Sequence, residues 1–267
     1  MNTFVFDIET IPDVAGYRAL HPTLADLPDA DVMEAMFAQR RAQSGSDFQP
    51  HYLQRIVAIS VVLATPKGVK VWSLGDINSD EADLIKRFFK GIEQYTPTLI
   101  SWNGSGFDLP VLHYRALLHG IAASKYWDVG ESDASFKWNN YLNRYHYRHL
   151  DLMDVLAAYQ GRANAPLNDI ATMLGFPGKM GMSGDKVAAA FLAGKLNEIR
   201  HYCETDVLNT YLVYLQFEKM RGRLTDEQLK EAHAQVKESL QLENKAHLTE
   251  FLQVWNSATH DRAERIS

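Results

Sequence analysis

The first 102 residues contain four short apolar runs separated by polar segments, a pattern typical of strands. Residues 3–8 (TFVFDI) and 98–102 (TLISW) are two of these runs. Residues 56–64 (IVAISVVLA) and 69–74 (VKVWSL) are the other two, and a Pro-Lys-Gly turn separates them. Two β-branched runs joined by such a turn predict a hairpin.

Helical periodicity appears between and after these runs. Residues 80–95 carry apolar side chains at intervals of three and four, and Pro97 follows them. A strand meander, followed by strand–helix units and then by helices, predicts an α/β fold with a mixed sheet rather than a doubly wound parallel sheet. The further helices that we predict span residues 108–120, 150–159, 166–174, 184–193 and 195–218.

Two segments interrupt this order and one follows it. Residues 12–54 form a polar insertion with helical tendency, and residues 121–149 form an insertion rich in aromatic and basic side chains. The pattern therefore predicts a domain over residues 1–218 with two insertions, followed by a charged helical extension over residues 219–267. We expect the extension to pack on the domain or to contact a partner protein or a second copy of the chain.

Composition narrows the class of protein. The chain has 267 residues, of which 46% are hydrophobic, so it can bury a substantial core. A single cysteine excludes an intrachain disulfide and predicts a reducing, cytoplasmic location. We expect no signal peptide and no membrane span, because no apolar run approaches the ~20 residues that a span requires. A formal charge of −6 argues against a protein that coats nucleic acid non-specifically, although a local grip on a strand remains compatible with it.

Acidic side chains stand at the edges of several predicted elements. Asp7 and Glu9 alternate with apolar residues, so they face one side of a strand. Asp108 opens a helix after a glycine-rich turn, and Tyr202 and Asp206 are one helical turn apart. Taken singly, these acids also suit an exposed strand edge, a helix N-cap and a helix surface. Taken together, they predict a site for a hard divalent cation, because such ions prefer carboxylate oxygens and relieve the repulsion between acids.

Three sequence motifs carry a family resemblance. FDIET, N-G-x-x-F-D and Y-x-x-x-D resemble the three exonuclease motifs of the DEDD superfamily, Tyr subtype, to which the proofreading domains of DNA polymerases belong. The closest likeness is to stand-alone bacterial proteins described as predicted 3'-5' exonucleases related to the family B polymerase proofreading domain. HLDLMDVL, LGFPGKMGMSGDKV and EIRHYCETDVLNTYLVY are similar to the same group, and the resemblance covers about residues 1–218.

The resemblance implies a ribonuclease H-like fold, with a central mixed five-stranded sheet flanked by helices. It implies a metal-dependent 3'-5' exonuclease that hydrolyses single-stranded nucleic acid from the 3' end, with DNA favoured over RNA. Two Mg²⁺ or Mn²⁺ ions would be held by Asp7, Glu9, Asp108 and Asp206, and Tyr202 would orient the attacking water. The likeness leaves three alternatives open: an exoribonuclease, a non-catalytic nucleic-acid-binding module, and another phosphohydrolase such as a nucleotide phosphatase.

Residues near the motifs are candidates for contacts with the nucleic acid. Thr10 and Phe107 are expected to meet the terminal nucleotide, and Asn103 either shapes its loop or contacts substrate. Trp102 either stacks on a base or, as we favour, packs in the core, and Lys179 either approaches a phosphate or lies in a plain surface loop. In the segment KWNNYLNRYHYRH, basic groups alternate with aromatic rings, which suits a single strand or internal packing. Its candidate phosphate contacts are Arg144 and Arg148.

Three further side chains near the motifs are assigned no catalytic role. We expect Glu204 to be solvated, because it lies on a different helical face from Tyr202 and Asp206. His149 is expected to serve as a cap or in the core. A catalytic thiol at Cys203 is not expected, because the sequence supplies no His or Cys partner at a known spacing.

Overall fold

The computed structural model describes the backbone of residues 2–266 and the side chains of residues 2–258. Within this range the chain forms an α/β fold around one five-stranded sheet, in the order β3-β2-β1-β4-β5. The strands are β1 (Thr3–Pro12), β2 (Gln54–Thr65), β3 (Gly68–Ser73), β4 (Thr98–Ser101) and β5 (His149–Asp151). The first three strands form an antiparallel meander, whereas β4 and β5 run parallel to β1. The mixed sheet and the ribonuclease H-like fold are thus confirmed.

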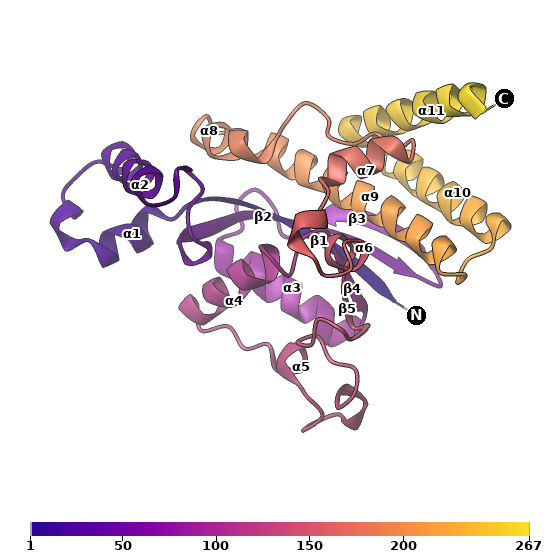
Figure 1. Cartoon of the computed structure of the whole chain (residues 1–267). Helices are drawn as coiled ribbons and strands as arrows, with labels where there is room; N and C mark the ends of the chain where they lie inside the picture. The colour runs from indigo at the N-terminus through magenta and orange to yellow at the C-terminus, as the bar shows by residue number, and fades with distance from the viewer. Residues whose placement is uncertain (1, 267) are drawn as a thin grey trace.

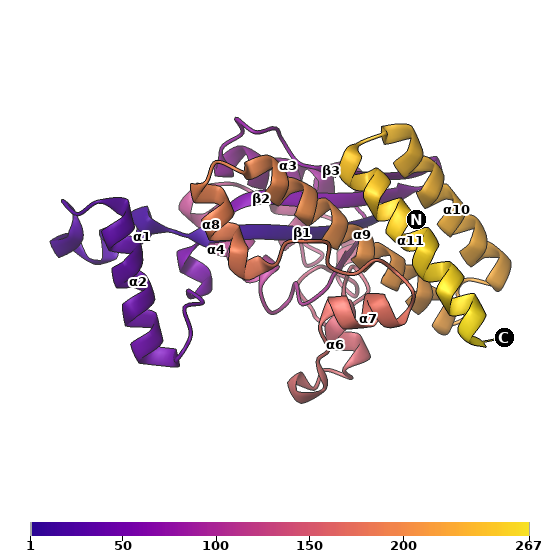
Figure 2. The same cartoon turned by 90° about the horizontal axis from the view of Figure 1, so that it is seen from above.

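Helices cover both faces of the sheet (Figure 1). On one face lie α3 (Glu81–Tyr95) and α4 (Asp108–Leu118), and on the other lies the long helix α9 (Leu196–Met220). Figure 2 shows that α10 and α11 lie over the same face as α9. The remaining helices are α1 (Val14–Leu20), α2 (Asp29–Ser44), α5 (Ser124–Trp127), α6 (Leu152–Leu156), α7 (Leu167–Met173), α8 (Val187–Leu192), α10 (Asp226–Glu243) and α11 (Ala246–Ile266).

Successive side chains of β1 point alternately to the two faces of the sheet, so they belong alternately to the core under α3 and α4 and to the core under α9. Phe4, Phe6 and Ile8 belong to the core between the sheet and the helices α3 and α4. Val5 belongs to the core between the sheet and α9. Because successive side chains of a strand point to opposite faces, Asp7 and Glu9 share the α9 side with Val5.

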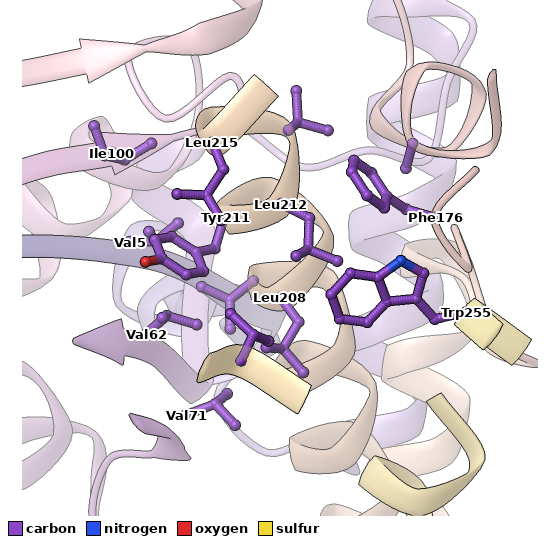
Figure 3. Packing of buried hydrophobic residues seen from close by; sticks show 14 of the residues in the cluster. Val5, Val62, Val71, Ile100, Phe176, Leu208, Tyr211, Leu212, Leu215 and Trp255 are labelled. Carbon is purple, nitrogen blue, oxygen red and sulfur yellow. The ribbon is translucent and has the colours of Figure 1, made fainter. Parts of the chain in front are cut away.

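The larger core lies between the sheet, α9 and the C-terminal helices. Figure 3 shows side chains of α9 such as Leu212 packed between Val5 on the sheet and Trp255 on α11. Leu240 of α10 and Phe251 of α11 are fully buried in the same cluster. The extension therefore packs on the domain, which was one of the two expectations for it.

One predicted element is wrong and several bounds differ. The helix predicted over residues 150–159 is instead the strand β5 followed by the short helix α6. A strand of three residues, all of them buried, shows no period of its own, so it cannot be distinguished from a helix by pattern. β1 is longer than predicted and extends to Pro12, which pairs with Gln54.

The first insertion contains two helices that project beyond one end of the sheet (Figures 1 and 2). They have a small core of their own, made by Tyr17, Val32, Met36 and Leu53. The second insertion contains α5, a short 3-10 helix (Ala134–Phe136) and irregular turns between α4 and β5. Among the described residues, no helix is both long and apolar enough to cross a membrane.

A buried ion-pair network joins the first insertion to the sheet layer. The guanidinium of Arg115, on α4, pairs with Asp13 at the start of the insertion and with Glu81 at the start of α3. Glu81 also accepts a hydrogen bond from the Ile56 backbone N–H at 2.7 Å. All three charged side chains are almost fully buried.

We expect Arg115→Met to destabilise the protein by about 3–5 kcal/mol, because it leaves two buried carboxylates without their partner. The midpoint of urea unfolding measures this loss. The matched control is Arg87→Met, which breaks an exposed ion pair with Asp83 and should leave the urea midpoint nearly unchanged, because exposed ion pairs contribute little to stability. Equal costs for the two variants would show that the buried network contributes no more than a surface pair.

Candidate active site

The strand β1 presents two carboxylates where its pairing with β2 becomes irregular. Glu9 pairs with Ala58 and Thr10 pairs with Ile56, so Val57 is an extra residue in β2. Such a bulge bends the pair and redirects nearby side chains, and it is common beside active sites. Glu9 is buried, whereas Asp7 retains some exposure to solvent.

Asp108 comes to the same place from α4. It is the first residue of the helix and is buried, and Phe107 occupies the N-cap position. Its Oδ1 accepts a hydrogen bond from the backbone N–H of Ile8, at 3.1 Å, between the two acids of β1. The alternative interpretation of Asp108 as a helix N-cap is therefore wrong.

A carboxylate that the sequence analysis assigned to a helix shapes the loop before Asp108. Asp151 ends β5, and it accepts hydrogen bonds from the backbone N–H groups of Asn103 at 2.9 Å and Ser105 at 2.8 Å. Asn103 has a positive φ of 64°, which asparagine tolerates better than most residues. A Cβ at Gly104 would lie 2.3 Å from the Ser101 hydroxyl, so glycine is required there. The only sequence signal for Asp151 was its place in HLDLMD.

The helix α9 supplies the remaining predicted residues. Tyr202 and Asp206 are both buried, and their side chains interact. Between them, the Cys203 thiol donates to Asp7, 3.4 Å from its carbonyl oxygen and 3.6 Å from its Oδ2. Ligand atoms of Asp7, Glu9 and Cys203 lie within 4.8 Å of one another. The expectation that Glu204 is solvated is wrong, because this residue is buried.

Burial and mutual repulsion disfavour the charged forms of these acids. Burial, and then the charges of Asp108 and Asp206, hold the pKa of Asp7 well above its usual range. Burial, and then the charge of Asp7, do the same to the pKa of Glu9. Burial also raises the pKa of Asp108 to about 7 and that of Asp206 to about 6, although hydrogen bonds oppose both shifts.

The cluster suits a hard divalent cation. Its donors are carboxylate oxygens, and Oδ1 of Asp206 is buried without a hydrogen-bond partner. A buried acceptor without a partner is costly, and a cation would supply the missing interaction. Burial raises the pKa of the Cys203 thiol well above its ordinary value, so this side chain remains protonated and is a poor ligand for such an ion.

Lys179 brings positive charge to the cluster. Its Nζ lies 6.0 Å from the centre of the Tyr202 ring, and its charge lowers the pKa values of Asp7 and Asp206. Asn209, which the sequence analysis missed, holds the Lys179 loop against α9. Its side chain exchanges two hydrogen bonds with the backbone of Gly178, at 3.1 and 2.8 Å. A lone asparagine within a helix gives no sequence signal for this role.

The residues predicted to contact the nucleic acid near the motifs, Thr10, Trp102 and Phe107, differ in how far they are engaged within the chain. Thr10 donates a hydrogen bond to Gln54 at 2.9 Å. Trp102 is partly buried against the larger core, and its indole N–H donates to the Ala165 carbonyl at 3.2 Å, so its contacts favour the core interpretation. Phe107 contacts the ring of Phe48, which is exposed to solvent.

An aromatic cluster adjoins Asp108. The ring centroid of Phe107 lies 5.5 Å from that of Phe48 and 5.7 Å from that of His51, both from the first insertion. Phe48 is 55% exposed, yet its backbone is fixed, because its carbonyl accepts a hydrogen bond from Arg40 at 2.7 Å. The sequence analysis did not find Phe48 or His51, since the insertion carried no motif.

Both arginines of the aromatic segment are engaged within the chain. Arg144 forms an ion pair with Asp154 at 2.8 Å, and it also lines a cavity of about 640 Å³ together with Asn103. The guanidinium of Arg148 lies 3.8 Å from the centre of the Phe136 ring and donates hydrogen bonds to the Asn139 carbonyl and the Ser135 hydroxyl. For Arg148, these contacts favour the packing interpretation.

Comparisons with known proteins place the chain in a family. Residues 46–255 match the family described as predicted 3'-5' exonucleases related to the exonuclease domain of PolB. The match covers most of the chain, so the protein belongs to this family. It begins after Asp7 and Glu9, includes Asp108, Tyr202 and Asp206, and continues through α10 into α11.

One solved structure among those similar to the chain is a polymerase. The family B DNA polymerase from the hyperthermophilic archaeon Pyrobaculum calidifontis is 16% identical, with a TM-score of 0.48 over 90% of this chain. This chain covers 28% of that polymerase chain. No curated protein matches the chain.

The acid cluster predicts that the metal-free protein loses stability as the pH rises. Each acid has a higher pKa in the folded chain than the ~4 expected when unfolded, so the folded chain binds more protons. The resulting stabilisation is fully present below about pH 4, and it is lost as the pH rises through the folded pKa values of about 6 and about 7. In EDTA, Asp206→Asn should therefore melt at a higher temperature than the wild type at about pH 8, with a smaller difference at about pH 5.

Because the wild type and Asp206→Asn contain the same buried histidines, the difference between their melting temperatures does not include the titration of those histidines. Asp26→Asn, at an exposed acid, is the control and should not change the profile. Mg²⁺ should raise the melting temperature of the wild type more than that of Asp206→Asn. A stability difference between wild type and Asp206→Asn that is independent of pH would contradict this account of the cluster.

Proposed function

We propose that the protein is a metal-dependent 3'-5' exonuclease of the DEDD superfamily, Tyr subtype, acting on single-stranded DNA. The observation that carries the proposal is the meeting of Asp7, Glu9, Asp108 and Asp206 beside Tyr202, in a chain of an exonuclease family. Two Mg²⁺ or Mn²⁺ ions held by these acids would activate water and stabilise the leaving 3' oxygen.

The acids and Tyr202 then have different roles. Asp7 would hold the metal ions together with Glu9, Asp108 and Asp206, because its carboxylate interacts with those of the other acids. Tyr202 keeps its proton, because burial and the charge of Asp206 raise its pKa above the ordinary phenol value. It can therefore donate a hydrogen bond that orients the attacking water, but it does not act as the base. Lys179 offers the cluster a cation that suits a substrate phosphate.

The preference for DNA rests on the relationship to a polymerase proofreading domain, and RNA is the alternative substrate. A purely binding role is less well supported. Four neighbouring acids with raised pKa values, three of them buried, oppose folding when they are charged, and a module that only bound a negatively charged strand would gain nothing from them.

The activity is tested with a 5'-labelled single DNA strand in Mg²⁺ or Mn²⁺. A ladder of products that shorten from the 3' end is expected. Asp206→Asn should lose nearly all turnover, and Tyr202→Phe should lose about 10²-fold in kcat with little change in KM, because it removes the hydroxyl that orients the water and that also interacts with Asp206. Tyr114→Phe, at a half-exposed tyrosine of α4, is the matched control.

An RNA strand and free nucleotides are assayed in parallel. Faster hydrolysis of RNA would favour the exoribonuclease, and phosphate released only from nucleotides would favour the phosphatase. Strand binding without cleavage in either metal, by a protein that melts normally, would leave the binding module and exclude an exonuclease.

The aromatic cluster beside Asp108 predicts stacking of a substrate base. Phe48→Ala should weaken the binding of single-stranded DNA by about tenfold, because a stacked base contributes ~1–3 kcal/mol. Binding is measured by fluorescence anisotropy on the Asp206→Asn background, which prevents cleavage. Phe48→Tyr keeps the ring and should bind normally. On a strand whose last two 3' nucleotides are abasic, Phe48→Ala and its parent should bind equally; the same tenfold loss on both strands would exclude base stacking.

A further inference from the structure

We propose that the C-terminal extension completes the catalytic unit, with Glu204 and His247 acting as positioning residues that hold the turn of α9 carrying Tyr202 and Asp206. The expected effect on kcat rests on the proposed function, whereas the contacts of Glu204 and His247 do not depend on it. It assigns a role to a segment that carries no exonuclease motif.

Glu204 is the centre of the arrangement. It is buried on α9, and its Oε1 accepts hydrogen bonds from both the backbone N–H and the hydroxyl of Ser73, at 2.9 and 2.8 Å. Its Oε2 accepts a hydrogen bond from Nε2 of His247 at 2.8 Å, and Nζ of Lys245 lies 3.7 Å away. One carboxylate thus joins the edge strand β3, the helix α9 and the extension.

His247 makes a second contact with the same turn of α9. Its ring stacks on that of His201, with centroids 4.0 Å apart and an angle of 9° between the planes. His201 directly precedes Tyr202, and Glu204 lies midway between Tyr202 and Asp206. The first turn of α11 therefore contacts α9 at His201 and at Glu204, within the segment that carries the predicted active-site residues.

The extension also helps to form the space beside Tyr202. A cavity of about 600 Å³ is lined by Tyr202 and Thr205 from α9 and by His247 and Glu250 from α11. The extension thus forms one wall of a cavity whose other wall includes the tyrosine that we assign to the attacking water.

The physical reason for a tether lies in the stiffness of a helix. Tyr202 and Asp206 both lie on α9, a helix of 25 residues. A small rotation of this helix therefore moves both side chains together relative to Asp7 on β1. The apolar core resists separation of the layers, but it is non-directional. Hydrogen bonds to a buried carboxylate are directional and fix the rotation.

The test compares two histidines of the extension. In His247→Ala, we expect kcat on single-stranded DNA to fall about 10- to 100-fold with KM within about twofold, because the reacting groups are misplaced. His247→Gln should recover most of the activity, since its amide can donate to Glu204. His233→Ala is the matched control: His233 lies on α10 against Phe176 and Trp255, and its loss should leave kcat unchanged.

A double variant tests whether the two positioning residues act through each other. Glu204→Ala with His247→Ala should be little worse than the poorer single variant, because each single substitution already removes the contact between Glu204 and His247. Normal kcat in His247→Ala would overturn the proposal. So would equal losses in His247→Ala and His233→Ala, because they would show a general packing effect.

A readout without catalysis separates this proposal from the proposed function. Mn²⁺ affinity, measured by isothermal titration calorimetry, should fall about tenfold in His247→Ala and stay unchanged in His233→Ala. If the wild type cleaves no nucleic acid, the exonuclease assignment fails, and this comparison still decides the positioning role. Equal Mn²⁺ affinities in the wild type and His247→Ala would then overturn it.

Discussion

Four carboxylates from three separate elements share a small, largely buried space, and the structure around them is built to keep them there. Burial and repulsion raise the pKa values of these acids, so the folded protein disfavours their charged forms. Such a cluster persists when its backbone is held firmly and when protons or a cation compensate the negative charge. The acids accordingly stand on β1, at the first residue of α4, and on α9, all anchored by an extensive core.

A surrounding set of buried polar side chains fixes the elements that carry the acids. Asp151 holds the loop before Asp108, and Asn209 holds the loop that carries Lys179. Glu204 joins α9 to β3 and α11. Each of these side chains is satisfied by hydrogen bonds, which is the condition under which buried polar groups contribute rigidity instead of cost.

The segments added to the central domain also reach this region. The first insertion touches it through the Phe48–Phe107 contact and is fastened by Arg115, and the extension touches it through His247. The family match runs through both the later part of the insertion and most of the extension. Insertion and extension are therefore better understood as parts of the domain than as appendages.

Local patterns predicted much of this molecule. The alternation of β1, the β2–β3 hairpin and the long helices were readable because their periods repeat over several residues. The same alternation predicted that Asp7 and Glu9 share a face opposite Phe6 and Ile8, as they do. β5 was not found, because three buried residues carry no period, and residues 150–159 were wrongly assigned to a helix.

The sequence by itself predicted the class of fold from its periodic patterns, and its motifs, through their family resemblance, predicted the five residues that we propose for catalysis. Only the tertiary structure decided which polar residues support them. Asp151, Glu204, Asn209 and Phe48 resemble ordinary surface residues along the chain, and their partners are up to 131 positions away. A hydrogen bond or a ring contact depends on where two groups finally meet, and that is set by the packing of whole layers.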